Sequence, residues 1–293
     1  MLSPPAPVSP APVPATSRGA GPLPRRSPGT STTSMTSLRF FPFLAAFVLV
    51  GCASTQAPQA QAPQAQAPTY DYDPAVALTA ETQAALTPME VIQRLKDGND
   101  RFINGQAISR DFLGQVRQTA GGQYPMAAIL GCIDSRVPHE IVFDKGVGDI
   151  FSARVAGNFV NTDILGSLEF ATAVAGSKVV VVLGHTECGA VKGACDQVVL
   201  GNLTATLSNI APAVYAIDDV EGPRSSANKE YVQAVAHQNV EMTVRNMVER
   251  SPVMHGLVEE GKLIVVGAMH NVATGEVEFF EDTMVTAETI NQD

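Results

Sequence analysis

The chain has 293 residues, and 45% of them are hydrophobic, which suits one globular domain of about 200 residues with extensions. Its net charge is −10, but residues 1–51 contain four arginines and no acidic residue. Residues 52–293 therefore carry 15 basic and 29 acidic side chains, a net charge of −14. This balance excludes electrostatic binding of nucleic acid or of an anionic lipid surface.

The first 51 residues are predicted to lie outside the folded domain. Residues 1–34 are rich in Pro, Ser and Ala without apolar periodicity, which predicts a disordered extension or a misplaced start codon upstream of Met35. Residues 35–51 combine the positive charge of Arg39 with the apolar run 40–50, as a signal peptide does. This run is too short to span a bilayer as a helix.

The apolar run ends in Leu49-Val50-Gly51-Cys52, which resembles a bacterial lipoprotein signal that is cleaved before a lipidated Cys52. An ordinary secretory signal, or a short anchor with an incidental cysteine, is the alternative. In lipoproteins with such signals, an Asp after the lipidated Cys often marks retention in the inner membrane. Ala53 follows Cys52 here, so the resemblance implies a protein on the periplasmic face of the outer membrane, held by a lipid anchor alone. Residues 52–78 contain an Ala/Pro/Gln repeat and are predicted to be an extended tether in the cell envelope.

Residues 79–293 are predicted to form one α/β domain. Short apolar runs bounded by breakers are typical of buried parallel strands, and such runs occupy 126–130, 150–156, 178–183 and 262–269. A turn at Ala273-Thr274-Gly275 then leads to a fifth strand ending near Phe280. Helical patterns occupy 79–101, 116–120, 137–143, 164–175, 190–200, 203–216, 229–248 and 251–261. We therefore predict a mainly parallel four-stranded sheet with an antiparallel edge strand, flanked by helices, with the strand order open.

Chemically active side chains follow two of these strands. Cys132 and Asp134 come directly after the first strand, and His185 and Cys188 follow the third. Because the carboxyl ends of parallel strands share one edge of the sheet, these side chains are expected to gather there. Two thiolates and an imidazole suit zinc and leave one tetrahedral position open. Either pair alone is also compatible with a buried cysteine and a structural histidine.

The segments Cys132-Ile133-Asp134-Ser135-Arg136 and His185-Thr186-Glu187-Cys188 resemble those of the β-class carbonic anhydrases. The resemblance covers residues 85–281 and includes Gly148–Phe151, Arg154–Asn158 and Cys188–Lys192. It implies one zinc ion per chain, held by Cys132, His185 and Cys188. It also implies the reversible hydration of carbon dioxide to bicarbonate and a proton by a zinc-bound hydroxide, in a homodimer or a larger homo-oligomer.

Asp134 and Arg136 are the expected catalytic pair. Asp134 either accepts a hydrogen bond from the hydroxide and orients it, or takes the fourth metal position and blocks it. A bidentate contact from Arg136 would hold the carboxylate away from the metal. The alternative for Arg136 is a surface salt bridge. The sequence leaves open which arrangement the resting site adopts.

The remaining candidate residues are expected to have no catalytic or metal-binding role in the first instance. His139 is expected to be a solvated helix residue, with proton shuttling at the rim as the alternative, and Glu187 a loop residue. Cys195 is expected to be a small buried residue. The histidines without partner spacing are not expected to bind metal: His237, His255 and His270.

Two other functions compete with carbon dioxide hydration. The same zinc set could hydrolyse carbonyl sulfide or carbon disulfide, as relatives of this family do. Alternatively, the protein could be a non-catalytic, zinc-stabilised envelope lipoprotein that binds a partner. Asp134 and Arg136 argue against the second alternative, because a structural zinc site closes all four positions with ligands.

Overall fold

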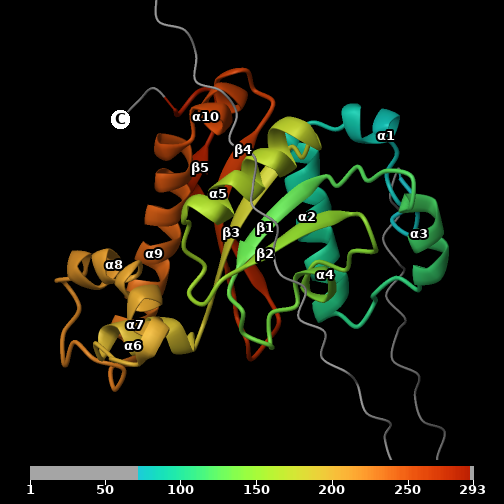
Figure 1. The fold of residues 1–293 in the computed structure, drawn as a ribbon. Coiled ribbons are helices and arrows are strands. Elements are labelled where there is room, and N and C mark those ends of the chain that lie inside the picture. The colour runs from blue at the N-terminus through green and yellow to red at the C-terminus, as the bar shows by residue number, and fades with distance from the viewer. Residues whose placement is uncertain (1–71, 291–293) are drawn as a thin grey trace, which may run out of the picture. The chain divides into compact units, whose positions relative to one another are not determined.

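A computed structural model describes residues 72–290. The predicted extension, the signal, lipidation at Cys52 and most of the tether lie outside the described residues. The strands form one sheet in the order β2-β1-β3-β4-β5 (Figure 1). Four strands are parallel and β5 is antiparallel to β4, which confirms the predicted fold class. The strand bounds are β1 Ala127–Gly131, β2 Ile150–Arg154, β3 Val179–His185, β4 Ile264–His270 and β5 Val277–Val285.

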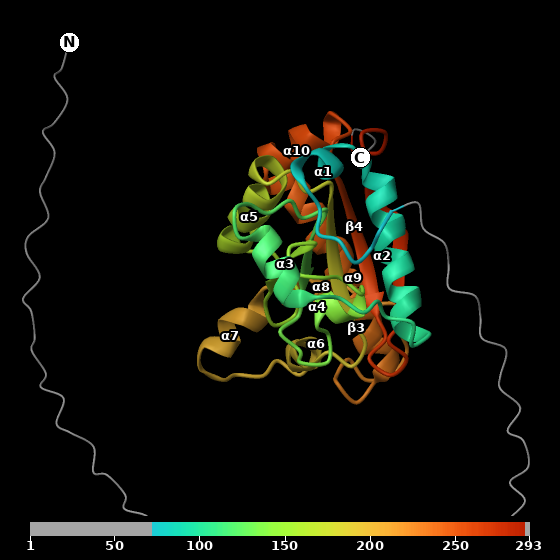
Figure 2. The same cartoon turned by 90° about the vertical axis from the view of Figure 1, so that its right-hand side faces the viewer.

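Helices cover both faces of this sheet. Successive residues of β1 and β3 belong alternately to two buried apolar clusters, one on each face. One face of the sheet packs mainly against α2. Figure 2 views the molecule from this side, on which α1 and α3 also lie. The helices before β2 are α1 (Ala80–Ala84), α2 (Pro88–Ile103), α3 (Phe112–Thr119) and α4 (His139–Val142). The other face packs against α5 (Thr162–Glu169), the π-helical turn η1 (Phe170–Val174), α6 (Gly189–Cys195), α7 (Gly201–Ser208), α8 (Ala211–Ala216), α9 (Lys229–Arg250) and α10 (Pro252–Glu259).

Two segments with a helical pattern each contain two helices, and in both the second helix has a proline in its first turn. The segment 79–101 becomes α1 and α2, because Thr87 caps α2 through its side chain and Pro88 occupies the first turn. The segment 203–216 becomes α7 and α8, again with a proline in the first turn of the second helix. Among residues 72–290, no helix is both long and apolar enough to cross a membrane.

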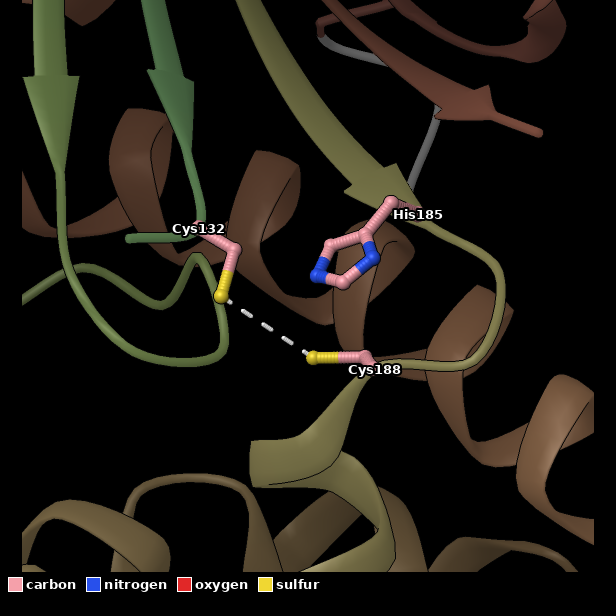
Figure 3. A group of neighbouring side chains, drawn as sticks. All are labelled: Cys132, His185 and Cys188. Carbon is pink, nitrogen blue, oxygen red and sulfur yellow. Dashed lines mark hydrogen bonds between the residues drawn. The ribbon is translucent and has the colours of Figure 1, made fainter. Parts of the chain in front are cut away.

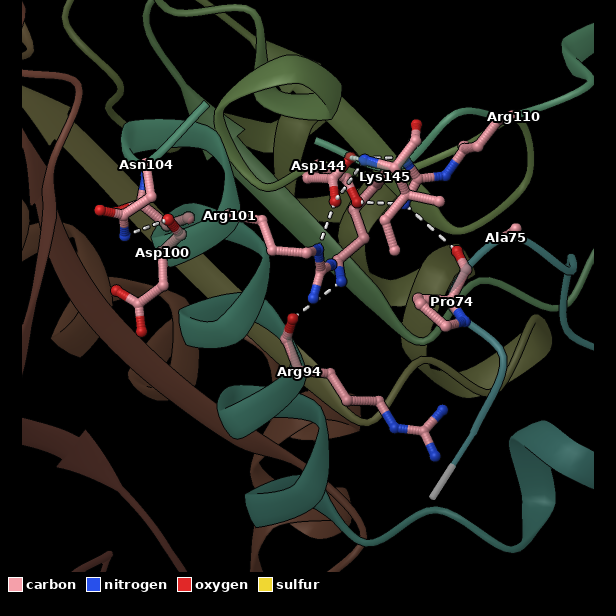
Figure 4. Close-up of polar contacts among 12 residues, drawn as sticks. Pro74, Ala75, Arg94, Asp100, Arg101, Asn104, Arg110, Asp144 and Lys145 are labelled. Carbon is pink, nitrogen blue, oxygen red and sulfur yellow. Dashed lines mark hydrogen bonds and ion pairs between the residues drawn. The ribbon is translucent and has the colours of Figure 1, made fainter. Parts of the chain in front are cut away.

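The chain is bound to the domain from Tyr72 onward, and not only from the predicted boundary at 79. The guanidinium of Arg94 lies 3.8 Å from the ring centroid of Tyr72. Arg110 donates to the carbonyl of Pro74 at 3.2 Å, and Gln115 donates to the carbonyl of Ala75 at 2.8 Å. Figure 4 shows Pro74 and Ala75 near a cluster of charged side chains that contains Arg101, Arg110 and Asp144.

Asp144 is the centre of this cluster. It accepts hydrogen bonds from Arg101 at 2.5 Å and from Arg110, and the three side chains are only 2–3% exposed. Burial raises the pKa of Asp144, but the hydrogen bonds from the two arginines outweigh it, so this pKa lies below its ordinary value. The carboxylate therefore compensates buried positive charge that water does not reach.

Lys145 lies next in the chain and is also buried. Its ammonium group donates to the carbonyl of Arg94 at 2.8 Å. Burial lowers the pKa of Lys145 to about 7, against an opposing contribution from Asp149. The folded protein therefore favours the neutral amine over a wide range of alkaline pH.

We predict that Asp144→Asn lowers the free energy of unfolding by about 3–5 kcal/mol, because it leaves two buried guanidinium groups without their counter-ion. Asparagine preserves the size of the side chain and tolerates the positive φ of 45° at this position. The matched control is Glu281→Gln, which removes an exposed ion pair with Lys96 and should cost no more than about 1 kcal/mol. Urea unfolding of the zinc-loaded chain measures both variants, and equal losses would contradict the assigned role of Asp144.

A second prediction concerns pH. The folded pKa of Lys145 is about 7 and its unfolded pKa is about 10.4, so the unfolded state binds more protons between these values. The contribution of Lys145 to the free energy of unfolding should therefore rise from pH 7 to about pH 10. Urea unfolding of the wild type and of Lys145→Met, both zinc-loaded, gives this contribution as a difference. A difference that stays flat or falls over this range would show that Lys145 is charged in the folded state.

Candidate metal centre

Three side chains converge at the carboxyl edge of the sheet (Figure 3). Cys132 directly follows β1, His185 ends β3, and Cys188 is the residue before the first turn of α6. The chain runs from β1 to β2 on one side, whereas β3 pairs with β1 on the other, so β1 and β3 flank the topological switch point of the sheet. The three ligand atoms lie within 4.8 Å of one another, and all three residues are buried.

The imidazole of His185 is held in one tautomer. Its Nδ1 lies 3.0 Å from the carbonyl oxygen of Thr186, so Nδ1 carries the proton and donates it. Nε2 is buried and has no hydrogen-bond partner in the described part of the chain. Its lone pair is therefore available to a metal ion between the two sulfurs, and the neutral imidazole is the form that binds metals.

The two cysteine side chains face each other. Their sulfur atoms are 4.0 Å apart. The hydrogen bond from Cys188 lowers the pKa of Cys132, assisted by His185 and by the backbone N–H of Gly157. The same bond, together with burial, raises the pKa of Cys188. A divalent cation would stabilise both thiolates, so this pocket fits a soft metal ion such as zinc.

Asp134 lies beside the three converging side chains and accepts hydrogen bonds from Arg136. Nε of Arg136 donates to Oδ1 at 2.9 Å and Nη2 donates to Oδ2 at 2.8 Å, which makes the contact bidentate. The hydrogen bonds from Arg136 hold the pKa of Asp134 well below its usual range. Oδ2 is 3.9 Å from Nε2 of His185, close to the ligand atoms but outside the converging group. The structure thus brings together all five residues that the sequence singled out around the metal.

Two further contacts position Cys132, and sequence reasoning alone assigned neither. Arg154, at the end of β2, donates to the carbonyls of Cys132 at 2.8 Å and Asp134 at 2.6 Å. The N–H of Gly157 points to the sulfur of Cys132 at 3.4 Å. Strand register could have revealed the first contact, because Arg154 lies opposite Gly131 in the parallel pair of β1 and β2.

Both expectations for His139 are wrong. This residue is fully buried and its Nδ1 lies 2.7 Å from Oγ of Ser152. It packs so closely over Gly131 that a Cβ there would come within 2.1 Å of the imidazole. Its burial excludes contact with solvent. Burial also lowers the pKa of His139 to about 3, so the imidazole does not take up a proton near neutral pH.

The expected roles of Glu187 and Cys195 agree with the structure. The Glu187 side chain is exposed and pairs with Lys192, and Cys195 is a buried free thiol. His270 is paired in register with His185 but lies outside the converging ligand group. The two remaining histidines pair with a glutamate one helical turn away: His237 with Glu241 and His255 with Glu259.

Comparisons with known proteins agree with this site. Residues 127–277 match the family described as "Carbonic anhydrase". The chain is 34% identical over 194 residues to carbonic anhydrase 2 of Mycobacterium tuberculosis, which covers 64% of this chain and 90% of the relative. It is also 34% identical over 198 residues to a carbonic anhydrase of Mycolicibacterium smegmatis, which covers 65% of this chain and 92% of that protein.

Solved structures show the same fold. The β-carbonic anhydrase CcaA superposes with a TM-score of 0.51 at 24% identity, over 65% of this chain and 92% of that one. The β-carbonic anhydrase CafA of Aspergillus fumigatus gives 0.51 at 23% identity, over 70% of this chain and 95% of that one. The sheet, the switch-point position of the cysteine–histidine cluster and the family match lead to one conclusion: this chain belongs to the β-class carbonic anhydrase family.

Proposed function

We propose that this protein catalyses the reversible hydration of carbon dioxide to bicarbonate and a proton at one zinc ion held by Cys132, His185 and Cys188. The observation that carries this proposal is the buried, unpartnered Nε2 of His185 facing two cysteine sulfurs. Three protein donors leave one tetrahedral position for the reacting water. Zinc bound there would supply a Lewis acid that lowers the pKa of this water from about 15.7 towards neutrality.

Asp134 is proposed to orient the attacking oxygen. Its carboxylate stays ionised because the fork from Arg136 lowers its pKa. An ionised carboxylate only accepts hydrogen bonds, so it fixes the direction of the O–H next to it and turns the oxygen lone pair towards carbon dioxide. Since both carboxylate oxygens are engaged by Arg136, Asp134 is held outside the ligand group, and we propose the open arrangement of the site.

The two thiolates offset the formal charge of a zinc ion, so we expect activity to favour alkaline pH. A purely structural zinc site would need a fourth protein ligand in the group, and the described residues supply three. Hydrolysis of carbonyl sulfide or carbon disulfide is favoured by no specific contact. Assembly into a homodimer or a larger homo-oligomer stays a prediction from the family resemblance.

We predict that Asp134→Asn lowers carbon dioxide hydration by about 100-fold or more, because the amide cannot accept in the same way and its NH₂ group faces Arg136. Stopped-flow measurement on the zinc-loaded full chain, from about pH 6.5 to about pH 9, gives turnover and its pH dependence. The control is Glu187→Gln, which removes the neighbouring carboxylate that points to Lys192 and should leave turnover unchanged. Wild-type zinc content of one per chain without turnover would instead favour sulfur substrates or a binding role.

Metal binding gives a separate prediction, independent of turnover. Cys188→Ala should lose zinc on dialysis, because it removes one of three soft donors. Cys195→Ala removes another buried thiol, at the end of the same helix, and should retain one zinc per chain. Elemental analysis of the dialysed full chains measures the result. Equal zinc content in the two variants would place the metal elsewhere.

A further inference from the structure

A buried asparagine on α9 contacts the turn that holds Cys132. The buried face of α9 is mostly apolar, yet Asn239 lies on it and is only 3% exposed. Its Nδ2 donates to the carbonyl oxygen of Gly157 at 2.9 Å. A polar side chain in this position would cost free energy unless it were paired, so the contact is a specific feature of this helix.

Gly157 is held in a backbone conformation that depends on its surroundings. Its φ is +86°, and that of Asn158 is +42°, so two successive residues occupy the left-handed region. A Cβ at Gly157 would lie 2.3 Å from Cδ1 of Ile210 and 3.4 Å from Cβ of Ala190. Glycine fits the space and the φ, but it contributes no side chain that fixes the orientation of its peptide groups.

Hydrogen bonds therefore fix Gly157 from two sides. Its carbonyl accepts from Asn239, and its N–H points to the sulfur of Cys132 at 3.4 Å. The bond from Asn158 N–H to the carbonyl of Val155, at 3.0 Å, closes the turn between them. Without Asn239, the carbonyl of Gly157 would be buried and unpaired, and the turn would gain free energy by rotating towards another partner. That carbonyl belongs to the same peptide group as the N–H of Asn158, so such a rotation would break the bond to Val155. The loosened turn would then shift the N–H of Gly157 relative to the sulfur.

We propose that Asn239 is a positioning residue for the metal ligand Cys132, acting through Gly157. This inference rests on the zinc site proposed above. An N–H bond to a metal-bound thiolate withdraws electron density from sulfur and fixes the direction of the ligand. Through Asn239, a residue of α9 would help to position a metal ligand that lies at the end of β1.

The test replaces Asn239 with Leu, which removes the donor at similar size. Thr243→Val is the matched control, because Thr243 is equally buried one turn further along the same helix and makes no hydrogen bond to the Gly157 turn within residues 72–290. Cobalt(II) takes the place of zinc in the full chain, and its thiolate-to-cobalt charge-transfer band reports on the electron density of sulfur. A chromogenic chelator then measures the rate of zinc release from the folded, zinc-loaded chains.

We expect Asn239→Leu to shift the charge-transfer band to longer wavelength and to release zinc about 10-fold faster or more, with Thr243→Val like the wild type. An unshifted band in Asn239→Leu would overturn the proposal, even with faster release, because a merely loosened helix also speeds release. A wild-type chain without a thiolate-to-cobalt band would overturn both this proposal and the zinc site. If the Leu variant does not fold, Asn239→Ser leaves the same carbonyl unbound and is measured in the same way.

Discussion

The structure depends on the burial, at one edge of a parallel sheet, of three side chains whose donor atoms could bind a metal ion. Cys132, His185 and Cys188 are 0–4% exposed, and the Nε2 of His185 has no protein partner within the described residues. Burying such donors is unfavourable unless something pairs with them. A divalent cation would satisfy all three at once, so the proposed metal binding would also stabilise this edge.

The loop after β1 is held from several directions. Arg154 binds its carbonyl groups from β2, and Gly157 points its N–H at the Cys132 sulfur. Arg136 fixes Asp134 beside the ligands without reaching the metal position itself. Arg154 lies on β2 and Gly157 in the turn after it, and Asn239 on α9 binds the carbonyl of Gly157, so the geometry of the site reflects the packing of these three elements. A site held in this way is preorganised, which lowers the cost of reaching the reacting arrangement.

A second charged cluster lies beside α2 and contains none of the candidate metal ligands. Asp144 compensates Arg101 and Arg110, and the latter also binds the backbone at Pro74. The start of the described chain is thereby tied to the loop between α4 and β2. Buried ion pairs of this kind rarely add net stability over apolar packing, but losing one partner is costly. The cluster therefore acts mainly to fix how the N-terminal segment lies against the domain.

Local sequence patterns predicted the strands, the fold class and the residues that converge at the candidate metal centre. Apolar runs ending in glycine identified β1 and β3, and the positions directly after these strands predicted that Cys132, Asp134, His185 and Cys188 gather at one edge of the sheet. The remaining features depend on long-range packing and are seen only in the tertiary structure. It placed β1 between β2 and β3, buried His139 against Gly131, and brought Asn239 to the turn after β2. These contacts join residues far apart in the chain, and no local pattern encodes which helix face meets which turn.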